Sequence, residues 1–180
     1  DPEREVPQEQ EAAYRQMIDK RSTHIPLQYL TGEQEFMGLT FKVNEHVLIP
    51  RQDTEILVEE IMRDLHDGIR ILDMCTGSGC ILLSLLHYSN DCSGVGADLS
   101  EEALEVARKN AEQLGENSAL FVQGDLFAPV EGKFEIIVSN PPYICSDVIP
   151  TLMEEVREHE PMQALDGGAD AVSYTHLTLP

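Results

Sequence analysis

Residues 140–143, Asn-Pro-Pro-Tyr, have the types and spacing needed to orient a planar amino group. Pro141 restricts its own φ angle and biases Asn140 away from helical geometry, and Pro142 restricts Pro141 in the same way. The resulting stiff loop would present the Asn140 side-chain amide and the Pro141 carbonyl outward. Two such acceptors can receive both protons of an –NH₂ group, and Tyr143 can stack on its flat face. The motif therefore predicts an amino-group site, and the alternative is a proline-rich turn with a core tyrosine.

A glycine-rich turn lies at residues 73–79, Asp-Met-Cys-Thr-Gly-Ser-Gly. Gly77 and Gly79 would let the backbone approach a ligand closely, because they carry no Cβ atom. The turn is not the phosphate-binding fingerprint, since residues 80–82 supply no third glycine and no Lys-Ser/Thr pair follows. By itself, the segment could also be a plain turn between a strand and a helix.

Two aspartates close the next two expected strands. Asp98 follows the glycines by about twenty residues, where a carboxylate can accept hydrogen bonds from both hydroxyls of a ribose. Asp125 ends a third strand and could meet the exocyclic amine of an adenine. Each aspartate alone is more often a helix cap or a turn former. Together with the glycine turn, they predict a nucleoside ligand held without a phosphate cradle.

The segments that must position these residues alternate between strand and helix. We expect strands at 70–74, 94–98, 119–123 and 134–139, and helices at 80–88 and from Ser100, as N-cap, to Gly115. This alternation predicts an α/β fold, with a parallel sheet and helices on both faces. In such sheets ligands bind outside the carboxyl ends of the strands, where all three motifs fall.

The N-terminal third predicts smaller elements. A helix at 7–21 would carry an apolar stripe of Ala13, Tyr14, Met17 and Ile18. Alternation over 35–43 and 47–49 predicts a β-hairpin that turns at Asn44-Glu45 and ends at Pro50. Asp53 or Thr54 would cap a following helix whose apolar face is Ile56, Leu57, Ile61 and Leu65.

Composition narrows the function classes. The 180 residues include 12 Lys and Arg against 33 Asp and Glu, a net charge of −21, which argues against binding nucleic acid through its phosphates. No apolar run approaches the ~20 residues of a membrane span, so no membrane association is expected. The four cysteines show no CxxC spacing, which favours a reducing, cytoplasmic setting.

The motifs resemble class I S-adenosylmethionine-dependent methyltransferases, in which an Asn-Pro-Pro-Tyr loop marks methylation of amino groups. The loop is shared by adenine-N6 DNA methyltransferases, some RNA enzymes and glutamine-N5 protein methyltransferases. Segments 26–32, 35–36, 48–55 and 156–161, with Ala164-Leu165, resemble the peptide chain release factor glutamine methyltransferase family in particular. The resemblance runs from about residue 24 to about residue 170.

This resemblance implies a Rossmann-like sheet with helices on both faces, of which about four of the family's seven strands are present. The sheet would be incomplete at the C-terminus. Residues 1–30 would be the remnant of an N-terminal helical, substrate-binding domain, 31–50 a β-hairpin linker, and 51–171 a partial methyltransferase domain. Apart from the resemblance, residues 172–180 change character abruptly after the acidic segment before them, which predicts a non-native tail, with a native strand as the alternative. The implied reaction moves a methyl group from S-adenosylmethionine to the N5 nitrogen of the glutamine in a release factor's Gly-Gly-Gln motif.

The resemblance also implies roles for the motif residues. The cofactor would be held by Asp73, Cys75, Thr76, Gly77, Ser78, Gly79, Asp98, Asp125, Leu126 and Asn140. Asn140, Pro141, Pro142 and Tyr143 would bind the glutamine and carry the reaction, without a metal. The chain departs from the family at Cys75, where glycine is usual, at Gln52-Asp53, where Pro-Asp is usual, and at Leu126, which is often aromatic.

Two other functions remain possible on sequence alone. A nucleic-acid amino methyltransferase, acting on adenine N6 or guanine N2, would need a basic strip and usually a base-recognition domain, and neither is visible. A nucleotide-binding module without activity would account for the glycines and Asp98. It would leave the 140–143 loop without a role.

Overall fold

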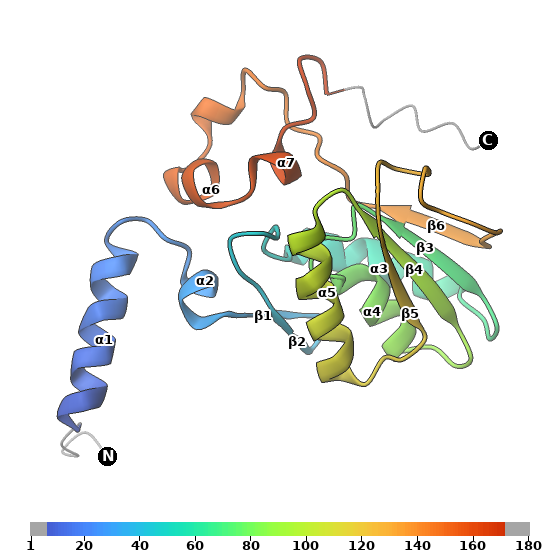
Figure 1. Cartoon of the computed structure of the whole chain (residues 1–180), viewed down its shortest axis with the longest axis horizontal. Helices are drawn as coiled ribbons and strands as arrows, with labels where there is room; N and C mark the ends of the chain where they lie inside the picture. The colour runs from blue at the N-terminus through green and yellow to red at the C-terminus, as the bar shows by residue number, and fades with distance from the viewer. Residues whose placement is uncertain (1–6, 172–180) are drawn as a thin grey trace.

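The structure is a computed structural model that describes residues 7–171, so the predicted tail at 172–180 lies outside the described residues. Its centre is a parallel sheet of four strands in the order β5-β4-β3-β6 (Figure 1). The strands are β3 (Arg70–Met74), β4 (Ser93–Asp98), β5 (Ala119–Gln123) and β6 (Ile136–Ser139). The predicted α/β class and all four predicted strands are confirmed.

The strand order places the ligand side of the sheet. From β3 the chain winds outward through β4 to β5, then returns to add β6 on the other side of β3. This reversal at β3 and β6 opens a crevice at their carboxyl ends, where ligands bind in open parallel sheets. Met74 and Ser139 are the paired residues at that edge.

Three helices pack on one face of the sheet, namely α3 (Gln52–Asp64), α4 (Cys80–His87) and α5 (Glu101–Leu114). α4 is apolar almost throughout, and its Leu82 is completely buried. Gly94 on β4 makes this close packing possible, because a Cβ atom there would lie 2.3 Å from a Leu82 methyl carbon. The same face also holds Ile71 and Val138 in one core cluster.

The opposite face of the sheet differs from the prediction of helices on both faces. Within residues 7–171 its core of Leu72, Met74, Val95 and Ala97 is covered by irregular chain after β5, including Phe127, Val130 and Phe134. Leu120 on β5 and Ile137 on β6, the two edge strands of the sheet, are exposed on this face. The alternation of strand and helix predicts crossovers, but the β5–β6 connection forms no helix.

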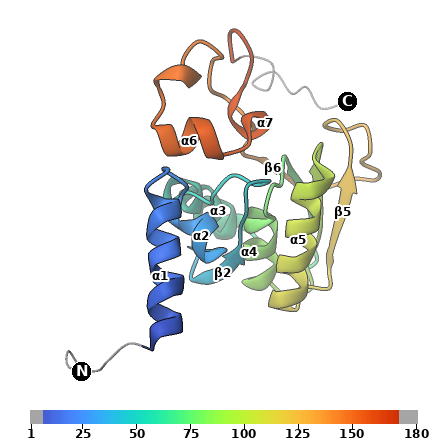
Figure 2. The ribbon, with the colours of Figure 1, turned by 60° about the vertical axis from the view of Figure 1, so that its left-hand side comes forward.

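The N-terminal elements are α1 (Gln8–Arg21), α2 (Leu27–Thr31) and a hairpin of β1 (Glu33–Phe36) and β2 (Leu39–Lys42). Figure 1 shows α1 standing apart from the sheet and its helices, and Figure 2 shows it beside α2. The predicted helix at 7–21 is confirmed, and its apolar residues Tyr14 and Ile18 are exposed. A hairpin is present, but it is not the predicted one: residues 47–49 form no strand, and the chain turns at Met37 and Gly38 rather than at Asn44-Glu45. Both turn residues have a positive φ, which suits a two-residue hairpin.

The helix α3 also corrects two details. Its N-cap is Arg51, with no side-chain capping bond, rather than Asp53 or Thr54. Its buried residue is Val58, while Ile56 is exposed. Positions 57, 58, 61 and 65 form one helical stripe, and Ile56 falls on the opposite side because successive residues are about 100° apart.

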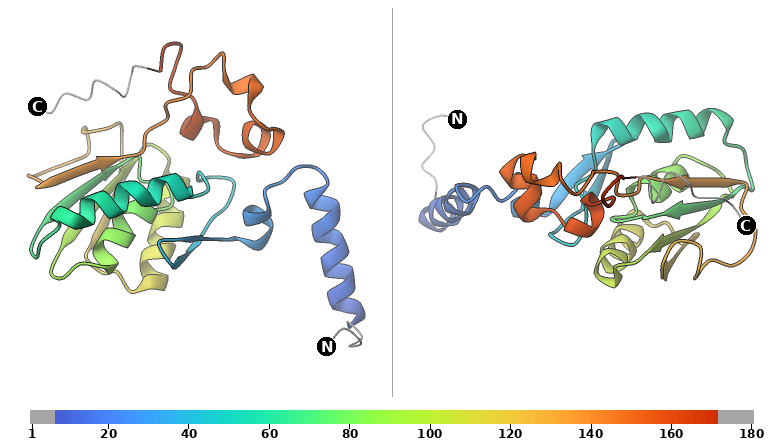
Figure 3. Two further views of the ribbon diagram at one scale, coloured as in Figure 1. Left: turned by 180° about the vertical axis from the view of Figure 1, so that it is seen from behind. Right: turned by 90° about the horizontal axis from the view of Figure 1, so that it is seen from above.

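The chain after β6 forms a cap over the carboxyl edge of the sheet (Figures 1 and 3). It contains the 3₁₀ turn η1 (Ile149–Thr151), α6 (Glu154–His159) and α7 (Met162–Leu165). Among residues 7–171, no helix is long and apolar enough to cross a membrane.

Candidate active site

A cavity of about 360 Å³ lies at the carboxyl ends of β3, β4, β5 and β6. Its walls come from four parts of the chain: the hairpin exit at 45–54, the strand ends at 74–80, 97–103 and 124–126, the loop at 140–142, and the start of α7 at 161–164. The cavity therefore gathers the three predicted motifs in one place.

The glycine-rich turn forms one wall of the cavity through Cys75, Thr76, Gly77 and Ser78. The Thr76 backbone N–H donates to the carbonyl of Ala97, 3.1 Å away, which ties the turn to β4. Gly79 was predicted to contact the cofactor, but it is not among the lining residues. A Cβ atom there would lie 3.1 Å from Leu83, so Gly79 serves the packing at the start of α4.

Cys75 occupies a backbone conformation that suits glycine better than any other residue. Its φ angle is +59°, in the left-handed region that costs an L-residue about 1–2 kcal/mol. Burial, followed by the nearby charges of Asp98 and Asp73, raises the pKa of its thiol to about 12. The side chain is therefore a neutral thiol on the cavity wall rather than a nucleophile.

Asp98 connects the glycine turn to the next strand end. One carboxylate oxygen accepts the N–H of Gly77 at 2.9 Å, and the other accepts the N–H of Ser100 at 3.0 Å. A carboxylate oxygen can accept more than one hydrogen bond, so the group can still receive donors from the cavity. Asp125 and Leu126 also line the cavity, as predicted.

Asp73 does not reach the cavity, which differs from its predicted contact with the cofactor. It is fully buried behind the turn, where one oxygen accepts the hydroxyl of Thr76 at 2.6 Å. The other oxygen has no partner among the described residues. Burial, which the hydrogen bond from Thr76 only partly offsets, raises the pKa of Asp73 to about 7. The carboxyl group supports the turn through Thr76.

The 140–143 loop enters the cavity through Asn140 and Pro142. Ser139 anchors its start by donating a hydrogen bond to the carbonyl of Met74 at 2.7 Å. Within residues 7–171, the Asn140 side chain has no hydrogen-bond partner, so its amide is available to a ligand. Pro141 and Tyr143 are not lining residues, and Tyr143 is 65% exposed. The predicted stacking by Tyr143 is not formed against this cavity.

The chemistry of the sequence motifs gave no role to the residues of the other two walls of the cavity, which come from the hairpin exit and from α7. His46 and Arg51 come from the hairpin exit, and Gln163 and Ala164 come from α7. Both regions were singled out by the resemblance, at 48–55 and 156–165. Their place in the sequence alone could not indicate that they face each other across one cavity.

Known proteins carry the same combination of segments. Residues 51–170 match the family described as "Methyltransferase small domain", and residues 1–32 match "PrmC N-terminal domain". The release factor glutamine methyltransferase of Geobacter sulfurreducens is 44% identical over 173 residues, which is 96% of this chain and 61% of the relative. That of Moorella thermoacetica is 47% identical over 169 residues, 92% of this chain and 59% of the relative.

The chain thus spans about three-fifths of the length of these curated relatives. Among solved structures, Trm5b from Pyrococcus abyssi superposes with a TM-score of 0.54 at 18% identity, over 67% of this chain and 36% of that one. This likeness concerns the fold alone. The resemblance seen in the sequence motifs is confirmed: the chain belongs to the methyltransferase small domain family, and its curated relatives are named release factor glutamine methyltransferases.

Proposed function

We propose that this chain transfers a methyl group from S-adenosylmethionine to the side-chain amide nitrogen of the glutamine in a release factor's Gly-Gly-Gln motif. One observation carries the proposal. The free Asn140 amide lines the same cavity as Asp98 and the glycine-rich turn. An amino-group acceptor and a nucleoside site therefore share one space, as methyl transfer to nitrogen requires. The names of the relatives support the choice of substrate.

The residues around the strand ends fit the cofactor. Asp98 and Asp125 present carboxylates, which suit ribose hydroxyls and an adenine amine and would repel a phosphate. Thr76 and Ser78 add neutral polar groups in the turn. S-adenosylmethionine has no phosphate and supplies an electrophilic methyl group on a positively charged sulfur. A site with acidic side chains and no phosphate-binding motif suits such a ligand.

The 140–143 loop would orient the amide nitrogen of the substrate glutamine toward the methyl group. An amide nitrogen is a poor nucleophile, because its lone pair is conjugated with the neighbouring carbonyl. The side-chain oxygen of Asn140, which lines the cavity, would accept an N–H proton of the substrate amide, aim the nitrogen and favour its pyramidal form. Fixed orientation of this kind reaches effective molarities of ~10⁵ M or more. The same acceptor would lie where positive charge develops on the nitrogen during transfer, which would add electrostatic stabilisation.

The acidity of the chain favours a protein substrate over DNA. A net charge of −21 opposes the phosphate contacts that supply most non-specific affinity for nucleic acid. A release factor makes no such demand. This argument supports the glutamine substrate and weakens the adenine or guanine alternative.

The direct test is incubation of this chain with labelled S-adenosylmethionine and either a purified release factor or duplex DNA. We expect label in the release factor, which mass spectrometry of its peptides should locate on the glutamine of the Gly-Gly-Gln motif. A release factor with that glutamine replaced by alanine is the matched control and should remain unlabelled. Label in DNA alone would reverse the choice of substrate.

A further inference from the structure

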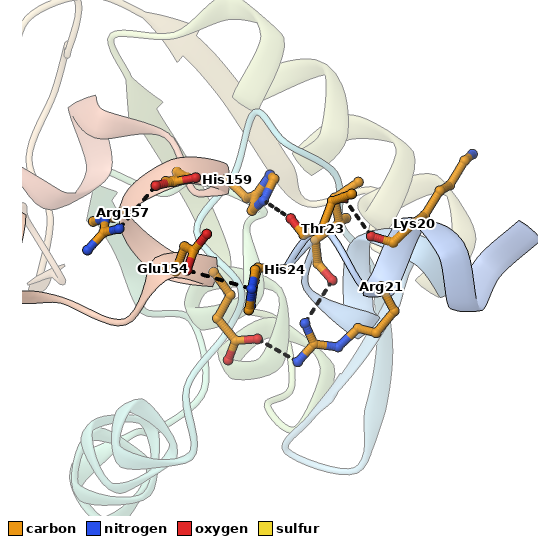
Figure 4. Close-up of polar contacts among 10 residues, drawn as sticks. Lys20, Arg21, Thr23, His24, Glu154, Arg157 and His159 are labelled. Carbon is orange, nitrogen blue, oxygen red and sulfur yellow. Dashed lines mark hydrogen bonds and ion pairs between the residues drawn. The ribbon is translucent and has the colours of Figure 1, made fainter.

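Residues 154–168, which we call the strap, run from α6 through α7 above the cavity. At its first end the strap contacts the junction between α1 and α2 (Figure 4). Arg21 pairs with Glu155 at 2.8 Å, His159 lies 3.0 Å from the carbonyl of Thr23, and His24 lies 3.6 Å from Glu154. These side chains are at least partly exposed to solvent. Exposed pairs of this kind contribute little to stability.

At its other end the strap contacts the chain that follows Asn140. The N–H of Ile144 donates to the carbonyl of Leu165 at 3.1 Å, and the N–H of Gly167 donates to the carbonyl of Ile144 at 2.8 Å. A Cβ atom at Gly167 would lie 2.9 Å from both the Pro142 carbonyl oxygen and Tyr143 Cα. The backbone of the 140–143 loop thus rests directly on the strap.

Glu160 lies between these two ends and is the buried polar group of the strap. One of its carboxylate oxygens accepts a hydrogen bond from the guanidinium of Arg51, and the other accepts the N–H of Ile49 at 3.3 Å. Arg51 lines the cavity from the hairpin exit, and Pro161, the next residue along the strap, lines it from above. One carboxylate therefore joins two opposite walls of the cavity.

We infer that Glu160 is a positioning residue, which holds the strap on the 49–51 segment and so keeps Asn140 at the cavity. The inference rests on the proposed function and adds a residue that touches neither substrate nor cofactor. Removing the Glu160 carboxylate leaves the buried N–H of Ile49 without its acceptor, which water does not replace at a buried position. Arg51, whose side chain is 42% exposed, loses its partner but can still reach water. The exposed Arg21–Glu155 pair carries no such penalty.

Kinetics with three variants test this role. Glu160→Ala should lower kcat by about 10- to 100-fold, the loss expected when a reacting group is displaced by about 1 Å. The cofactor dissociation constant should change little, because the strand ends are untouched. Glu160→Gln retains two polar atoms and should recover part of kcat. Glu155→Ala, on the same strap, is the control and should behave as the unsubstituted chain.

Hydrogen exchange provides a second measurement that does not depend on activity. In Glu160→Ala, we expect faster exchange in peptides that cover Ile144 and Gly167, with β3 and β4 unchanged, because the opening would be local. Uniformly faster exchange would mean a merely structural role and would overturn the inference, as would unchanged exchange at Ile144 and Gly167. If the unsubstituted chain methylates no release factor, the proposed function fails, and exchange still decides whether Glu160 holds the loop.

Discussion

The strand-end wall of the cavity and the strap that faces it are stabilised by different interactions. The wall at 74–78, 97–100 and 124–126 continues three paired strands, behind which Leu72 and Leu82 are completely buried. The strap consists of helices of six and four residues. It is held by a few backbone bonds, by exposed contacts with the α1–α2 junction, and by the ion pair of buried Glu160 with partly exposed Arg51. A substitution in the wall should therefore lower the stability of the whole fold, whereas a substitution in the strap should shift only the residues on one side of the cavity.

The same substitution in both regions tests this contrast. Leu82→Ala removes a fully buried side chain below the strand ends and should lower the free energy of unfolding by about 4 kcal/mol. Leu165→Ala, in α7, should lower it by about 2 kcal/mol, because the strap can collapse onto the gap. Urea denaturation measures both values. Equal losses would show that strap and sheet unfold as one unit.

Asn140→Ala removes the proposed acceptor and leaves the strand-end wall intact. We expect the rate of methyl transfer in a single turnover to fall about 10²- to 10³-fold, as when one preorganised polar group is lost from an active site. Calorimetry should show nearly unchanged affinity for S-adenosylmethionine. Asn117→Ala, at an exposed asparagine, is the control. Full activity in Asn140→Ala would remove this residue from the mechanism.

The buried carboxyl of Asp73 should make the wall sensitive to pH. Its pKa is raised from 3.8 to about 7 by burial, so the folded chain binds this proton more tightly than the unfolded chain. The free energy of unfolding should therefore decrease as the pH rises from about 4 to about 7, by on the order of 3 kcal/mol from this group. Asp73→Asn should abolish that part of the pH dependence. Parallel stability curves for the two proteins would contradict the assignment.

Asp98→Ala should act on the wall alone. It removes a carboxylate that faces the cavity and also orients the N–H groups of Gly77 and Ser100. Hydrogen bonds to a charged group contribute about 1.5–3 kcal/mol, so affinity for S-adenosylmethionine should fall about 10- to 100-fold. Asp98→Asn keeps one acceptor and should be intermediate in calorimetry. An unchanged affinity in Asp98→Ala would refute the ribose assignment.

Cys75→Gly should produce the smallest change. Glycine relieves the strain of the positive φ angle but loses the partly buried thiol and gains freedom in the unfolded chain, so we expect a change within about 1 kcal/mol in the free energy of unfolding. Cys75→Val should destabilise the protein by about 1–2 kcal/mol, because a β-branched side chain fits this φ poorly. Thermal denaturation distinguishes the two. A larger loss with glycine than with valine would mean that the thiol, not the backbone, matters here.

The contrast between the wall and the strap also separates the features that the sequence could predict from those that it could not. β3 and β5 were predicted with their bounds as found, because apolar runs between turn residues are local signals. The Ser100 cap and the Gly115 stop of α5 were predicted for the same reason. The hairpin turn was misplaced, because Asn44-Glu45 has the more typical turn composition. The chain instead uses Gly38 and a strained Met37.

The sequence by itself determined the elements of the wall and the chemistry of the 140–143 loop, since both depend on residues close together in the chain. The tertiary structure alone decided which of the predicted residues reach the cavity. It placed Asp73 and Gly79 behind the wall and Tyr143 outside the cavity, and it brought Arg51 to Glu160 across 109 positions. The physical reason is that such a pairing depends on how distant segments pack, and no local pattern of residues encodes that distance.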